Sequence, residues 1–165
     1  MSMDSAPRSG CPINQAVEVL GDPWAMLVLR DIMFGDRRHF RELLVGSEEG
    51  IAPNILSSRL RRLSDAGLLT RQEARRGQRA AYSLTEAGIQ TLPIMAALGS
   101  WGLAHRSGER RLRVRAELLR DGGQELLARF MDDLRYLHLG APRPDPHAPR
   151  AADDLRSAYE TALRE

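Results

Sequence analysis

The segment from Gly50 to Leu84 constrains the fold most, because a short amphipathic helix pattern is followed at once by the pattern of a two-stranded ribbon. Pro53 suits the first turn of a helix, and Gly67 can end one in the left-handed conformation. Leucines recur between them at helical spacing, at Leu56, Leu60 and Leu63. We therefore predict a helix over residues 53–66 that packs on one face and leaves its polar face exposed.

The predicted helix leads into a β-ribbon, or wing, over residues 70–84. Residues 70–73 and 81–84 have strand character, and an arginine-rich turn with a glycine lies between them. Residues 59–79 contain seven arginines against two carboxylates, a local balance of +5, whereas the whole chain carries only +2. The positive charge is thus concentrated in this helix and ribbon, and this indicates a polyanionic partner there.

The rest of the chain is predicted to be helical. Three short helices are expected upstream, over residues 13–20, 23–35 and 39–45. A long helix is expected from Thr85 to His105, kinked at Pro93. This helix is apolar on more than one side, and a second copy of the chain is its natural cover.

The C-terminal part reads as a helical extension. Leucines at helical spacing flank Gly122-Gly123, which predicts two helices that break at the glycines. A proline-rich linker over residues 140–150 precedes a last amphipathic helix. The fold class is therefore mainly α with a small two- to three-stranded β-wing, with one domain over residues 11–106 and an extension over 107–165. The extension either enlarges a dimer interface or forms an effector- or partner-binding module.

A set of residues in register carries a family resemblance. They are Cys11-Pro12, Gly21 to Trp24, Gly35, Arg38, Phe40, Glu42, Leu43, Ile51, Leu56, Arg59, Leu60, Leu63, Gly67, Leu68, Tyr82 to Thr85 and Gly88. From about Cys11 to His105 the chain resembles the HxlR-type winged helix-turn-helix regulators, which are related in architecture to MarR-type regulators. The resemblance implies a bacterial transcription factor that dimerises through the first and last helices of the domain.

The helix over residues 53–66 is the candidate recognition helix for the major groove of double-stranded DNA. The candidate base readers are Asn54, Ser57, Ser58 and Arg61. Asparagine can pair with adenine and arginine with guanine, and serine can bond to bases or phosphates. Arg59 and Arg62 are expected on phosphates, although Ser57 could be merely solvated and Arg59 could pair with a carboxylate of the chain.

Two further arginine sets are candidate contacts to the DNA backbone. On the wing, Arg75, Arg76 and Arg79 are expected to follow the backbone or enter the minor groove. Near the third helix, Arg37, Arg38 and Arg41 are candidate phosphate contacts, or else a solvated charged face. A two-fold homodimer would present two recognition helices, so the expected operator is an inverted repeat. The regulator is expected to be a repressor.

The single cysteine, Cys11, has two interpretations. It precedes a helix N-terminus, where a thiol can be activated, and the family that the chain resembles includes thiol-based sensors with a cysteine at this place, so Cys11 could sense oxidants or electrophiles. Alternatively, it is a small packing residue, and regulation comes from a small-molecule effector.

Other function classes have little support in the sequence. Cys11 and four scattered histidines give neither catalytic nor metal-ligand spacing, so no enzyme, cofactor or metal is expected. No apolar run approaches membrane-spanning length, so a cytoplasmic, nucleoid-associated protein is expected. A winged-helix module for protein contacts without DNA binding is the remaining alternative.

Overall fold

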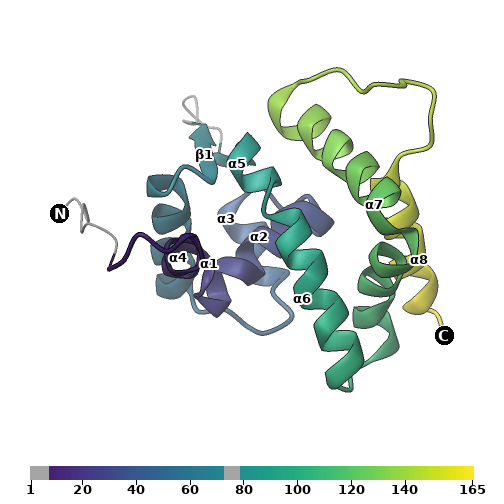
Figure 1. Ribbon diagram of the computed structural model, residues 1–165, viewed down its shortest axis with the longest axis horizontal. Coiled ribbons are helices and arrows are strands. Elements are labelled where there is room, and N and C mark those ends of the chain that lie inside the picture. The colour runs from purple at the N-terminus through teal and green to yellow at the C-terminus, as the bar shows by residue number, and fades with distance from the viewer. Residues whose placement is uncertain (1–7, 73–78) are drawn as a thin grey trace.

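The structure is a computed structural model that describes residues 8–72 and 79–165. The elements in chain order are α1 (Pro12–Leu20), α2 (Pro23–Gly35), α3 (Phe40–Val45), α4 (Pro53–Asp65), β1 (Leu69–Gln72), β2 (Ala81–Leu84), α5 (Glu86–Ile89), α6 (Leu92–His105), α7 (Arg110–Leu139) and α8 (Ala151–Ala162). In Figure 1, α1 to α5 and the ribbon form one side of the molecule, α7 and α8 form the other, and α6 runs between them. The predicted fold class, mainly α with a small wing, is confirmed.

The helices begin and end where local chemistry directs them. Asp22 caps α2, because its carboxylate accepts a hydrogen bond from the Ala25 N–H at 2.9 Å. After α4, Gly67 takes a φ of +72°, the left-handed stop expected from the sequence. The leucines of α4 are buried against α2 and α3, so the predicted division of α4 into a packed face and a polar face is confirmed.

The wing is an antiparallel pair in which Leu69 faces Leu84 and Arg71 faces Tyr82. His39 makes an isolated bridge to Ala81, which is all that exists of a third strand in the described chain. The ribbon continues into α5 through Thr85, whose hydroxyl caps that helix by accepting the Gly88 N–H. The same hydroxyl donates to the Gly67 carbonyl at 2.6 Å, which fixes the ribbon against the end of α4.

One element differs from expectation at Pro93. A single helix kinked at this proline was predicted over residues 85–105, but α5 ends at Ile89 and α6 begins at Leu92. Proline lacks an N–H and clashes with the preceding turn in a helix interior, whereas it is tolerated in the first turn. The chain therefore starts a new helix with Pro93 in its first turn instead of bending a continuous one.

The C-terminal extension packs as a helical layer. Gly123 interrupts α7 with a φ of +57°, which agrees with the predicted break at the glycine pair. The fully buried Asp133 holds the linker and α8, because its two carboxylate oxygens contact Arg143 Nε at 3.0 Å and the Ala152 N–H at 3.0 Å. The extension also touches the wing, where His138 Nδ1 accepts the Leu84 N–H at 3.2 Å.

Across residues 8–72 and 79–165, no helix combines the length and apolar character needed to cross a membrane.

Candidate nucleic-acid interface

The exposed face of α4 carries all four predicted base readers. The four side chains Asn54, Ser57, Ser58 and Arg61 are all exposed. At 1.5 Å per residue the 13-residue helix is about 20 Å long, and an α-helix of ordinary diameter fits the major groove. The structure thus places these four residues together on one accessible face, while their contacts with DNA stay a prediction.

Arg59 has a partner within the chain. Its Nε donates to Asp22 Oδ1 at 2.8 Å, and the two side chains are only 21% and 15% exposed. Burial acts to raise the pKa of the Asp22 carboxyl, but the Arg59 guanidinium and the Ala25 N–H outweigh it and hold that pKa below its usual value. This pair is the carboxylate partner that the sequence left open for Arg59, and it anchors α4 to the start of α2. A phosphate contact by Arg59 stays a prediction.

Two neighbouring residues of α4 are also partly engaged. Arg62 donates from Nη2 to the backbone carbonyl of Glu18 in α1, and it remains exposed. The Ser58 hydroxyl accepts a weak hydrogen bond from Arg59 Nη1 at 3.3 Å. Both bonds lie at the surface, so a phosphate or a base could replace them at low cost.

A basic hollow lies beside the exposed face of α4. It has a volume of about 630 Å³ and is bounded by α3, α4 and the two strands of the wing. Four exposed arginines line it: Arg41, Arg61, Arg71 and Arg79. No acidic side chain of the described residues lines this basic hollow. A concave surface with one sign of charge focuses its field and attracts a polyanion.

The three arginines near α3 separate into two roles. Arg37 donates to the Gly46 carbonyl at 2.6 Å and pairs with Asp31 at 3.4 Å. Arg38 bonds to the Tyr82 carbonyl at 3.2 Å and to the Ser83 hydroxyl. Both guanidinium groups thus bond to neighbouring parts of the fold, whereas Arg41 lines the basic hollow and has no hydrogen bond or ion pair with the described residues. Phosphate contacts by the three arginines stay a prediction.

The wing is described in part. Arg79 lines the basic hollow, whereas the predicted contacts Arg75 and Arg76 lie outside the described residues. Arg71 and His39 also line the basic hollow. The sequence analysis counts Arg71 in the basic cluster without assigning it a contact, and it weighs His39 only among the four scattered histidines. Its place in the arginine cluster is the signal that points to Arg71, because strand alternation alone would put it on the face of the buried Leu69.

Cys11 is exposed and is the N-cap residue of α1. Its redox role stays a prediction. Within the described residues, His, Cys, Asp and Glu form no cluster of three or more that could hold a metal ion.

A family model decides the identification. The model described as HxlR-like helix-turn-helix matches residues 19–110, more than half of the chain and all of the elements that build the α4 surface and the wing. The chain belongs to the HxlR-like helix-turn-helix family. The matched segment ends where α7 begins, so this HxlR-like protein carries most of its C-terminal extension outside the family segment.

Similar proteins have related descriptions. An uncharacterised HTH-type transcriptional regulator of Mycobacterium tuberculosis is 38% identical over 94 residues, which span 56% of this chain and 58% of that protein. The crystal structure of PA1607, provisionally assigned as a transcription factor, superposes with a TM-score of 0.56 at 32% identity over 62% of this chain and 70% of that one. The redox regulator HypR in its oxidised form gives a TM-score of 0.51 at 27% identity, over 59% of this chain and all of HypR.

Proposed function

We propose that this chain is a DNA-binding transcriptional regulator that places α4 in the major groove. The observation that carries the proposal is the continuity of the exposed α4 face with the basic hollow, which joins base-reading side chains to a surface suited to phosphates. The family match and the relatives named as HTH-type transcriptional regulators support it.

The roles of the side chains follow from this geometry. Asn54, Ser57, Ser58 and Arg61 would contact base edges, and Arg62 would contact a phosphate. Arg41, Arg71 and Arg79 would follow the backbone beside the groove, with Arg75 and Arg76 extending that line along the wing. Arg59 would act indirectly, by fixing the angle of α4 through Asp22.

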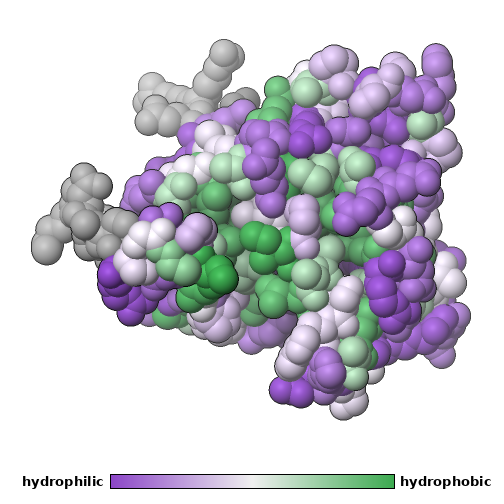
Figure 2. Space-filling view, viewed as in Figure 1, coloured by the Kyte–Doolittle hydropathy of each residue, from purple (hydrophilic) through white to green (hydrophobic). Residues whose placement is uncertain are grey.

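We further propose that the regulator is a homodimer. Large apolar side chains stand exposed on α1 and α6, namely Ile13, Val17, Ile94, Leu98 and Trp101. Figure 2 shows apolar surface gathered on the face where Figure 1 places α1 and α6. A two-fold axis through this face would pair two copies of α4, so the operator would be an inverted repeat, and occupancy of a promoter would repress it.

Genomic footprinting with the purified protein tests the proposal, because it identifies both the operator and the regulated promoters. The wild type and Arg164→Ala, an exposed arginine at the far C-terminus, should protect the same sites. A triple variant, Asn54→Ala with Ser58→Ala and Arg61→Ala, should protect none of them. Identical footprints for all three proteins would show that α4 is not the reading element, and no footprint for the wild type would favour a protein-interaction module.

Oligomeric state is measured separately by analytical ultracentrifugation. The wild type should sediment as a dimer, and Leu98→Glu should sediment as a monomer with an unchanged circular dichroism spectrum. A monomeric wild type at micromolar concentration would refute the dimer.

A thiol switch at Cys11 is a second candidate. The cysteine is exposed at the N-terminus of α1, near the proposed dimer face, and one similar solved structure is a redox regulator in its oxidised form. Peroxide would oxidise two Cys11 thiols of a dimer to one disulfide and be reduced to water. Wild type should then lose DNA on oxidation and show a reducible dimer band, while Cys11→Ser keeps its DNA. Equal responses of the two proteins would exclude the switch.

A further inference from the structure

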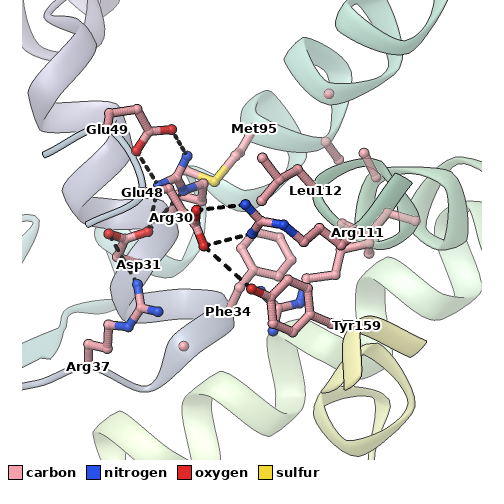
Figure 3. A pocket seen from close by; sticks show the side chains of 16 residues that line it. Arg30, Asp31, Phe34, Arg37, Glu48, Glu49, Met95, Arg111, Leu112 and Tyr159 are labelled. Atoms are coloured by element: carbon pink, nitrogen blue, oxygen red, sulfur yellow. Dashed lines mark hydrogen bonds and ion pairs between the residues drawn. The ribbon is translucent and has the colours of Figure 1, made fainter. Parts of the chain in front are cut away.

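A cavity of about 320 Å³ lies between the family segment and the C-terminal extension. α2 and α6 form one wall, and α7 and α8 form the other. Figure 3 shows its charged and apolar side chains converging from these elements. Its volume is at the lower end of the range of small-molecule pockets. It lies apart from the basic hollow and shares no lining residue with it.

Three arginines of this cavity are neutralised by carboxylates. Arg30 grips Glu49 with two hydrogen bonds of 2.7 and 2.8 Å and also contacts Asp31. Arg111 grips Glu48 with two bonds of 3.0 and 3.2 Å, and Arg37 pairs with Asp31. Figure 3 shows these pairs as dashed lines between the labelled side chains. The three carboxylates of the lining are thus all occupied, and none of them is available to a further cation.

Arg115 is the exception among the lining arginines. It is half-buried, and within the described residues no carboxylate lies in ion-pair distance of it. Its guanidinium stacks on the Tyr159 ring at 4.1 Å and lies 6.0 Å from the centre of the Phe34 ring. Its one side-chain hydrogen bond in the described chain is a long one of 3.5 Å, from Nε to the Leu155 carbonyl.

The electrostatics around Arg115 favour an added anion. Burial lowers the pKa of this guanidinium, and the positive charges of Arg37, Arg156 and Arg30 lower it further. A carboxylate placed beside Arg115 would offset both effects, and two parallel hydrogen bonds would fit the fork of the guanidinium.

The remaining lining is apolar. Phe34, Met95, Leu112 and Leu119 contribute large side chains, and small residues keep the space between α6 and α7 open. Gly99 is one of these, since a Cβ there would lie only 3.2 Å from the Cβ of Ala116. An apolar cavity with one convergent cation suits a ligand that has an apolar body and a single negative end.

We propose that this cavity binds a small organic monocarboxylate, with the carboxylate on Arg115 and the apolar body against Phe34, Leu112 and Leu119. Ligand binding by the DNA-free protein does not depend on the proposed DNA binding, so an experiment can refute either one without the other. Because the ligand would touch α6 on one side and α7 on the other, its binding would stabilise the packing of the extension against the dimer helix.

Calorimetric titration of the DNA-free protein tests the site with three probes: 1-naphthoate, octanoate and the neutral 1-naphthamide. At least one carboxylate should bind saturably at one site per chain, and 1-naphthamide should bind at least about tenfold more weakly than 1-naphthoate. Arg115→Gln should weaken carboxylate binding by about ten- to a hundredfold, the effect of losing a charged hydrogen-bonding partner. Arg164→Gln, the matched control, should bind like the wild type.

A second variant keeps the test decisive if Arg115→Gln alters folding. Ala96→Leu enlarges a side chain at a lining position and leaves Arg115 in place, so it should reduce carboxylate binding while the circular dichroism spectrum stays that of the wild type. Failure of both carboxylates to bind the wild type overturns the proposal. So does undiminished binding in a folded Arg115→Gln or Ala96→Leu protein.

Discussion

Substitutions of Asp22 should show how much each of its two interactions, the cap on α2 and the bond to Arg59, contributes to the free energy of unfolding. Its carboxylate caps α2 through the Ala25 N–H and anchors α4 through Arg59. Asp22→Ala removes both: loss of a cap costs about 1 kcal/mol, and loss of a charged hydrogen bond to a largely buried guanidinium costs about 1.5 to 3 kcal/mol. The expected loss of unfolding free energy is therefore about 2 to 4 kcal/mol, roughly 10 °C in Tm for a chain of this size.

Asp22→Asn is the matched comparison. Asparagine is an equally good helix cap and still offers Arg59 a neutral acceptor, so the expected loss is only about 1 kcal/mol. Asp65→Ala removes an exposed carboxylate from α4 and should change stability by no more than about 0.5 kcal/mol. Urea unfolding followed by circular dichroism measures all three, with an unchanged m-value. Equal losses for Asp22→Ala and Asp22→Asn, or a loss below 1 kcal/mol for both, would refute the anchoring of α4 by this carboxylate.

Three further predictions concern the wing, its support and the basic hollow. Burial, with a contribution from Arg38, lowers the pKa of His138 from 6.5 to about 4, so the ring is neutral in the folded protein. The neutral ring's contribution to the free energy of unfolding is complete above pH 6.5 and is lost as the pH falls towards 4. His138→Gln keeps an acceptor for the Leu84 N–H but cannot take up a proton. Between pH 6.5 and 4 this variant should therefore lose about 1 to 2 kcal/mol less stability than the wild type, after allowance for partial solvent access. A pH profile identical to that of the wild type would contradict this, and His147→Gln, at an exposed position, is the control. Gly88→Ala should prevent stable folding, because a Cβ there would lie 2.2 Å from the Leu68 carbonyl oxygen, whereas Gly102→Ala has open space and should raise Tm slightly; thermal melts of the pair decide, and equal Tm values would count against the close approach. Changing Arg41, Arg71 and Arg79 together to glutamine should reduce the slope of log affinity against log salt by up to about 3. Fluorescence anisotropy measures the slope, and the control is a variant in which Arg120, Arg156 and Arg164 are changed to glutamine. An unaltered slope would mean that the basic hollow does not touch phosphates.

The sequence predicted most of the family segment because its signals are local. The leucine spacing, Pro53 and Gly67 predict α4 to within one residue at its C-terminal end, since each acts through neighbours along the chain. The predicted kink at Pro93 is wrong, because the chain breaks into two helices there. A proline can either kink a helix or break it, and the sequence around Pro93 does not decide between the two.

Long-range pairing is what the sequence could not predict. Arg59 and Asp22 are 37 positions apart, and no local pattern indicates that they meet. The cavity around Arg115 depends on how α7 and α8 pack against α2, and the periodicity of those helices fixes which faces are apolar but not which helix each face covers.

The most direct test of the central claim compares two kinds of duplex: one selected by the wild type from a random library, and an unselected duplex of equal length. The account predicts that the selected duplex is an inverted repeat. It also predicts that Arg61→Ala loses about 1 to 3 kcal/mol of binding free energy on the selected duplex and less than about 0.5 kcal/mol on the unselected one. An equal loss on both would make Arg61 a phosphate contact, and wild-type affinity of Arg61→Ala for both duplexes would contradict the claim that α4 reads DNA.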